Sequence, residues 1–202
     1  MAFTFFFRDI QILELIIKHA VPNLVGRSRI RVWDAGCAMG QETYSLAIML
    51  AQGMGPFAFK NIQICASDIE ENNGFGDTVR SGIYQEEELK RIPPELLERY
   101  FARIEGNGHF QAHSILRDRI SYQRHDLLSL QPIGENFSVI LCKNVLLHFQ
   151  PEERIRVIRM FYDALAPDGS LATEQTQKMP EELAHLFTKA APDGQIFRKA
   201  GE

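Results

Sequence analysis

The chain has 202 residues, of which 45% are hydrophobic and 24% are charged, and its net charge is −4. This composition predicts one ordinary globular domain with a substantial core and gives no support for binding to nucleic acids or anionic membranes. The three cysteines lack metal-ligand spacing and accompany no secretory signal, so we expect reduced thiols in a cytoplasmic protein without a metal site.

The chain opens with a phenylalanine-rich run that is too short for a membrane span or a signal peptide. Apolar side chains then recur at helical spacing from Ile10 to Ala20, and Pro22 ends this predicted helix. We expect most of the phenylalanines to pack into the core. Arg8 is a permanent cation beside this apolar run, so it suits the binding of a carboxylate, although a surface ion pair is an equally good interpretation.

The stretch from 29 to 49 predicts a strand, a glycine-bearing turn and a helix. Ile30 to Trp33 alternates like a strand, and Asp34 follows it directly. Gly36 and the glycine four residues later then precede an amphipathic run from Tyr44 to Leu50. This is the opening unit of a nucleotide-binding α/β fold, in which glycine allows a sharp turn and a close approach to the ligand.

The spacing of the glycines in this turn argues against two common classes of phosphate-containing ligand. It lacks the third glycine of the dinucleotide fingerprint and the G-K-[ST] ending of a P-loop. With Asp34 and Glu42 nearby, it suits a ligand with a cationic or neutral tail, such as the methionine part of S-adenosylmethionine (SAM). A tight turn without a ligand is the alternative, and a nicotinamide-dependent enzyme is a more distant one.

Further strands and helices alternate along the rest of the chain. Residues 62–68 form a buried strand that ends in Asp68, an acid placed to accept hydrogen bonds from ribose hydroxyls or else to cap a helix. A helix weakened by Asn and Gly is expected over 71–82, and helical segments interrupted by Pro93-Pro94 are expected over 86–101.

The second half of the chain continues this alternation. A small β excursion is expected at about 102–124, with a hairpin flanked by Phe110 and Ile115 and a strand beginning at Ile120. His113 and His125 are interpreted as surface or capping residues. A buried strand over 137–142, a helix over 151–165, a turn at 167–169 and strands over 170–173 and 195–199 follow. The pattern predicts a single domain over residues 1–202 with a doubly wound, mostly parallel sheet.

Six segments in this order resemble the CheR family of chemotaxis receptor methyltransferases, which transfer a methyl group from SAM to glutamate side chains. They are FTFFFRD (3–9), RVWDAGCAMGQETYSLAI (31–48), ASDI with RSGIY (66–69 and 80–84), ERYF (98–101), ILCKNVLLHF (140–149) and LAPDGSL (165–171). The resemblance implies a Rossmann-like class I SAM-dependent methyltransferase fold, with S-adenosylhomocysteine as the product of the cofactor.

The resemblance also assigns roles to residues. Thr4 and Arg8 would lie at the methyl-transfer site, Glu42 near the methionine amino group, and Asn144 near the methionine tail. Asp68 would bind the ribose and Asp126-Leu127 the adenine. The expected catalytic residues are Arg8 and His148, of which His148 lines the acceptor pocket or lies at the surface. The expected cofactor-binding residues are Thr4, Arg8, Asp34, Gly36, Glu42, Asp68, Asp126, Leu127, Lys143 and Asn144.

The chain departs from the family pattern at several positions. The family's residues Asn, Glu, Asn, Arg and Tyr are replaced by Ala2, Gln41, Asp126, Lys143 and His148. The resemblance also implies a helical domain before the catalytic domain, with a role in docking on receptors, and we expect this chain to lack it. The expected function is methyl transfer to a glutamate of a chemoreceptor-like protein; the alternatives are another acceptor or a non-catalytic SAM-binding sensor or interaction module.

Overall fold

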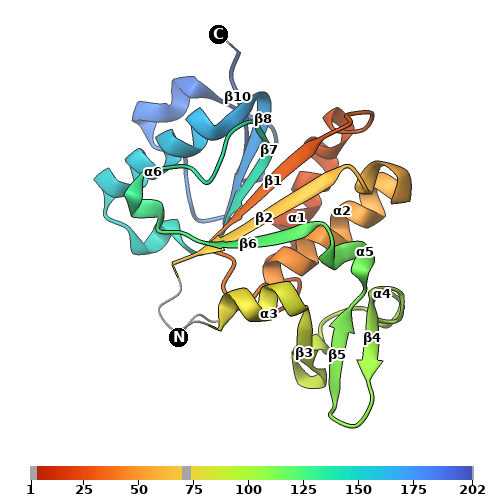
Figure 1. The fold of residues 1–202 in the computed structure, drawn as a ribbon. Helices are drawn as coiled ribbons and strands as arrows, with labels where there is room; N and C mark the ends of the chain where they lie inside the picture. The colour runs from red at the N-terminus through yellow and green to blue at the C-terminus, as the bar shows by residue number, and fades with distance from the viewer. Residues whose placement is uncertain (1–3, 70–73, 202) are drawn as a thin grey trace.

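A computed structural model describes residues 4–69 and 74–201. Ala2, which departs from the family pattern, and part of the Asn- and Gly-rich segment expected as a weakened helix lie outside the described residues. The molecule is organised around a seven-stranded sheet, with a separate three-stranded sheet at one end (Figure 1).

The main sheet has the strand order β6-β2-β1-β7-β8-β10-β9. Neighbouring strands from β6 to β8 are parallel, whereas β10 is antiparallel to both β8 and β9. This confirms the predicted doubly wound, mostly parallel sheet. The strands are β1 (Ile30–Ala35), β2 (Ile62–Asp68), β6 (Ile120–Arg124), β7 (Phe137–Cys142), β8 (Leu165–Thr173), β9 (Phe187–Lys189) and β10 (Ile196–Lys199).

Helices cover both faces of this sheet (Figure 1). Helices α1 (Ile10–His19) and α2 (Gln41–Phe59) pack on one face, and α6 (Pro151–Ala164) packs on the other. Because side chains alternate along a strand, β1 contributes to both cores: Val32 faces the first, and Trp33 faces the second.

The chain marks the start of α6 clearly. Pro151 occupies the first turn, where its missing N–H costs no hydrogen bond, and Gln150 and Glu153 form a reciprocal capping box. The other helical segments are short: α3 (Phe75–Ser81), α4 (Pro94–Tyr100), α5 (Ser114–Arg117), and the 3-10 turns η1 (Val21–Asn23), η2 (Glu86–Leu89), η3 (Leu127–Ser129), η4 (Leu146–His148) and η5 (Glu181–Leu186).

The small antiparallel sheet has the order β3-β5-β4, with strands β3 (Ile83–Gln85), β4 (Phe101–Ile104) and β5 (His109–Ala112). The predicted boundaries of the β excursion were therefore wrong. It begins earlier, at β3, whereas Ile120–Arg124 is parallel to β2 at the edge of the main sheet. Ile115 lies in α5 and flanks no hairpin. A short alternating strand does not reveal its partner, which explains the error.

The predicted turn at 167–169 was also wrong. These residues lie inside β8, where the register with β7 shifts between Phe137 and Val139. Gly169 permits this irregularity because a Cβ there would lie only 2.6 Å from the carbonyl oxygen of Phe137. The Pro-Asp-Gly sequence thus forms a bulge within a long strand.

Candidate active site

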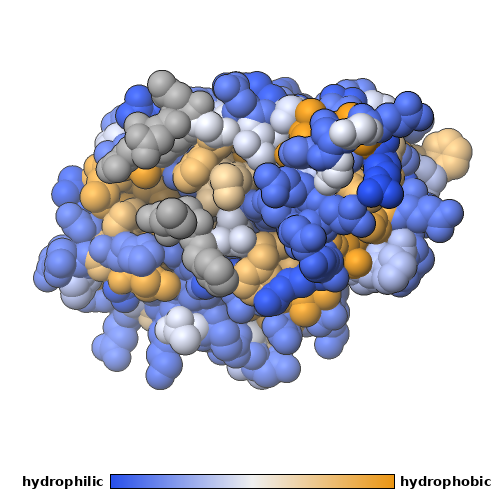
Figure 2. Space-filling model, turned by 90° about the horizontal axis from the view of Figure 1, so that it is seen from below, coloured by the Kyte–Doolittle hydropathy of each residue, from blue (hydrophilic) through white to orange (hydrophobic). Residues whose placement is uncertain are grey.

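A cavity of about 590 Å³ lies at the carboxyl ends of β1, β2 and β7. β1 and β7 are neighbours at the point where the strand order reverses, which is the usual position of a ligand site in open α/β sheets. Figure 2 views the molecule from this side, where apolar side chains gather in a hollow surrounded by hydrophilic ones. The lining residues are Thr4, Arg8, Gly36, Ala38, Glu42, Ser67, Asp68, Ile69, His125, Asp126, Leu127, Leu128, Lys143, Asn144, Val145, Leu147, His148 and Phe149.

The cavity therefore collects ten of the eleven residues predicted for the site. The exception is Asp34, which is fully buried but does not line the cavity. Its Oδ2 accepts a hydrogen bond from Thr43 Oγ1 at 2.5 Å. Asp34 lies two residues after Val32 and therefore faces α2, which directs its carboxyl group behind the cavity wall. The structure thus places Asp34 behind the cavity wall, and its expected cofactor-binding role stays a prediction.

The glycine turn brings main chain close to the cavity. Gly36 has φ +95°, a left-handed conformation that glycine adopts without strain. An added Cβ would lie 2.2 Å from Cγ2 of Val145, which also lines the cavity. The amides of Gly36 and Cys37 both donate to the carbonyl of Ser67, at 2.8 and 3.0 Å, which fixes the turn against β2.

Asp68 ends β2 at one side of the cavity. Its Oδ2 accepts a hydrogen bond from the amide of Ala38 at 2.9 Å, which joins it to the glycine turn. The alternative role as a helix cap does not apply, because Gly74 occupies the N-cap position of α3. The ribose role of Asp68 stays a prediction.

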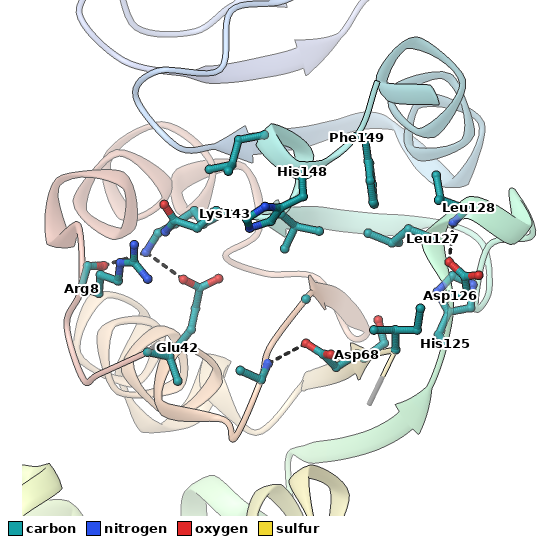
Figure 3. Close-up of a pocket in the computed structure, with 18 residues that line it drawn as sticks. Arg8, Glu42, Asp68, His125, Asp126, Leu127, Leu128, Lys143, His148 and Phe149 are labelled. Carbon is teal, nitrogen blue, oxygen red and sulfur yellow. Dashed lines mark hydrogen bonds and ion pairs between the residues drawn. The ribbon is translucent and has the colours of Figure 1, made fainter. Parts of the chain in front are cut away.

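Asp126 and its neighbours form the far wall (Figure 3). The carboxylate of Asp126 accepts a hydrogen bond from the amide of Leu128 at 2.8 Å and so begins η3. Leu127 is buried, whereas Leu128 and Ile69 are 41% and 52% exposed and form apolar cavity walls. Such aliphatic surfaces suit a flat aromatic base.

His125 also belongs to this wall, where the sequence predicted a surface or capping role. Its ring packs edge-on against Trp33, with centroids 5.6 Å apart, and its Nε2 lies 2.6 Å from the carbonyl oxygen of Gln131. His113 does occupy the N-cap position of α5, without a side-chain capping bond. The described residues contain no group of three His, Cys, Asp or Glu side chains suited to a metal.

A buried ion pair forms the wall nearest the N-terminal segment. Lys143 Nζ lies 2.8 Å from Glu42 Oε2, with side chains that are 1% and 10% exposed. The same ammonium donates to the carbonyl oxygen of Arg8 at 2.6 Å. Burial, and then the neighbouring Glu42 carboxylate, raise the pKa of Asp34 well above its ordinary value. Both effects favour the neutral form of the Asp34 carboxyl group, which lies behind the pair.

Arg8 and His148 reach the cavity from two different segments (Figure 3). The Arg8 side chain is 29% exposed, and its Nε lies 3.7 Å from Asp9 Oδ2. His148 is exposed at the end of η4. The structure thus places both expected catalytic side chains in one cavity with the expected cofactor residues, while their roles stay predictions.

Comparison with known proteins identifies the chain. Residues 2–193 match the family described as "CheR methyltransferase, SAM binding domain". The chain belongs to the CheR methyltransferase family. A probable chemotaxis protein methyltransferase of Rhizobium etli is 29% identical over 92% of this chain and 70% of its own length. Chemotaxis protein methyltransferases of Escherichia coli and Salmonella typhimurium are 32% and 34% identical, over 95% and 83% of this chain.

The chain spans 65% of the Escherichia coli relative and 57% of the Salmonella typhimurium one. The comparison thus confirms the CheR resemblance, and the sheet has the Rossmann-like order expected of a SAM-binding domain. SAM is accordingly the cofactor of this CheR domain.

The chain's own residues fit that cofactor. Glu42 Oε1 is buried and lacks a hydrogen-bond partner among the residues that the structure describes. Figure 3 shows the Glu42 carboxylate directed into the cavity, where it suits the ammonium group of an amino acid. The cavity volume lies within the range of about 300–1,000 Å³ that small-molecule sites occupy.

One buried acid near the CheR site escaped the sequence analysis. Glu174 follows β8, is 4% exposed, and accepts a hydrogen bond from the amide of Asn144 at 3.2 Å. Burial raises the pKa of its carboxyl group. The signal was present in the sequence, because Glu174 directly follows a strand, as Asp68 ends one and Asp34 lies next to the end of another. The wall residues Val145, Leu147 and Phe149 lay in the resembling segment but received no role.

Proposed function

We propose that this domain transfers a methyl group from SAM to the side-chain carboxylate of a glutamate in a protein substrate of the chemoreceptor type. The observation that carries the proposal is the sharing of one cavity by the buried carboxylate of Glu42 and the partly exposed guanidinium of Arg8. One carboxylate suits the cationic tail of the cofactor, and one guanidinium suits the carboxylate of an acceptor.

Different residues of the cavity would bind the two ends of the cofactor. Asp68, Asp126 and Leu127 would hold the nucleoside end of the cofactor, and Glu42 and Asn144 its amino-acid end. Bound SAM supplies a methyl group on a cationic sulfur, so that a C–O bond forms as the C–S bond breaks.

The acceptor glutamate needs no base, because its carboxyl group, with an ordinary pKa of about 4.3, is already ionised at neutral pH. Arg8 orients the acceptor carboxylate, and the apolar wall formed by Leu147 and Phe149 excludes water. Such positioning contributes up to about 7–11 kcal/mol in ideal cases.

The cysteines and the helices bear on where the protein acts. The three cysteines are free, and burial raises the pKa of Cys37 and Cys142, which keeps these thiols protonated. Within residues 4–69 and 74–201, every helix is too short or too polar to cross a bilayer. A cytoplasmic enzyme with a protein substrate accords with these features and with the chemotaxis relatives.

The test is Arg8→Ala, assayed with radiolabelled SAM and cytoplasmic fragments of chemoreceptors. We expect methyl transfer to be lost while the affinity for SAM, measured by calorimetry, stays nearly unchanged. Arg27→Ala is the matched control, because Arg27 is 32% exposed and pairs with Asp168 far from the cavity. Unchanged turnover in Arg8→Ala would remove its proposed role. SAM binding without transfer to any acceptor by the unaltered protein would favour the non-catalytic sensor.

A further inference from the structure

Asp9 contacts two side chains of the cavity without lining it. Its Oδ2 accepts a hydrogen bond from Asn144 Nδ2 at 3.2 Å and lies 3.7 Å from Arg8 Nε. Asn144 and Asp9 are 135 residues apart in the sequence. One carboxylate oxygen therefore joins the N-terminal segment to the loop that follows β7.

Helix capping does not explain this acid. Asp9 occupies the N-cap position of α1, where an aspartate side chain ordinarily accepts a hydrogen bond from the first turn. Its side chain makes no such capping bond among the described residues. The carboxylate instead contacts Arg8 and Asn144, so α1 lacks the stabilisation that a side-chain cap at Asp9 would provide.

The backbone around this contact is unusual. Phe7, Asp9 and Asn144 have φ of 57°, 50° and 58°, in the left-handed region that residues other than glycine rarely adopt. Each such residue is ordinarily strained, and these conformations gather at ligand and active sites. Asp and Asn tolerate them best, which matches the residues found at the two ends of the contact.

The main chain at Phe7 and Arg8 is already fixed by two contacts. The ammonium of Lys143 donates to the Arg8 carbonyl at 2.6 Å, and the amide of Phe7 donates to Ser45 Oγ at 2.8 Å. The guanidinium, however, lies at the end of a long flexible side chain. An ion pair with side chains 29% and 47% exposed adds little to the stability of the fold.

We propose that Asp9 is a positioning residue, whose carboxylate bridges Arg8 and Asn144 and sets the guanidinium at a fixed place relative to the cofactor wall. This inference rests on the proposed function, because it concerns how Arg8 meets the acceptor carboxylate. An error of about 1 Å in the placement of a reacting group lowers the rate by up to a hundredfold.

The test compares Asp9→Gly with Asp9→Asn. Glycine removes the side chain without adding strain at φ 50°, whereas asparagine keeps an oxygen that accepts from Asn144 but loses the charge. We expect Asp9→Gly to lower kcat for methyl transfer by about ten- to a hundredfold, with the Kd for SAM unchanged. Asp9→Asn should recover part of that loss.

Asp168→Asn is the matched control, because Asp168 is 50% exposed and pairs with Arg27 at a distance from the cavity. Its kcat should equal that of the unaltered protein. A wild-type kcat in Asp9→Gly would overturn the positioning role. A loss of SAM affinity that parallels the loss of kcat would also overturn it, since Asp9 would then serve the cofactor pocket. Absence of transfer by the unaltered protein would overturn the proposed function and this inference with it.

Discussion

Replacing Lys143 with methionine should destabilise the domain, because the change breaks its buried ion pair. Lys143 is 1% exposed and Glu42 is 10% exposed, so the glutamate has little access to water. Methionine has a similar length and an unbranched side chain, which limits the perturbation to the lost charge and its hydrogen bonds.

The expected cost follows from leaving one charge buried. Removal of one partner of a buried pair typically costs about 3–5 kcal/mol. In a domain of this size, each kcal/mol lowers the melting temperature by about 2–4 °C, so the product of the two ranges is a decrease of about 6–20 °C. An exposed pair gives a contrasting value of about 0–1 kcal/mol.

Urea denaturation and thermal melting, both without cofactor, measure the effect. The control is Lys90→Met, because Lys90 pairs with Glu87 through side chains that are 67% and 71% exposed. The double variant Lys143→Met with Glu42→Gln should be more stable than Lys143→Met alone, since it removes the orphaned charge. A cost below 1 kcal/mol, or a double variant whose loss equals the sum of the two single losses, would refute the argument.

Two further predictions concern Gly36, which lines the cavity, and Asp34, which lies behind the cavity wall. Gly36→Ala places a Cβ at 2.2 Å from Val145 Cγ2, so calorimetry should show an affinity for SAM that is at least about tenfold weaker. Gly106→Ala is the control and should bind SAM normally, because nothing lies within 4 Å of its added Cβ. Folding raises the pKa of Asp34, so the unfolding free energy should fall as pH rises from about 4 through the folded-state pKa of this group. Urea titrations from pH 4 to 8 measure this fall, and Asp34→Asn should flatten it.

The site was more predictable than some of the elements around it. Acids at the carboxyl ends of parallel strands must gather at one edge of a sheet, so Asp68 could be placed from the sequence. Asp34 obeyed the same rule but faces α2, because side-chain direction depends on the exact register of the strand end. The wall position of His125 depends on its packing against Trp33, which no local pattern reports.

Strand partners were the least predictable feature. The sequence from Ile120 to Arg124 alternates as any edge strand does, and only the assembled sheet shows that it lies beside β2. The Pro-Asp-Gly run before Ser170 is typical of a turn, yet in the structure it forms a bulge inside β8, where the register with β7 shifts. Long-range pairing decided both outcomes, and local propensity does not contain that information.

The small antiparallel sheet has a consequence for the active site through Phe6. This ring is fully buried and packs edge-on against Tyr84 of β3 and Phe101 of β4, with centroids 4.9 and 5.8 Å away. Phe6 is also two residues from Arg8, so the arginine's segment is anchored in the small sheet. Substitutions that reshape this aromatic cluster should therefore displace the segment that carries Arg8, although they lie outside the cavity.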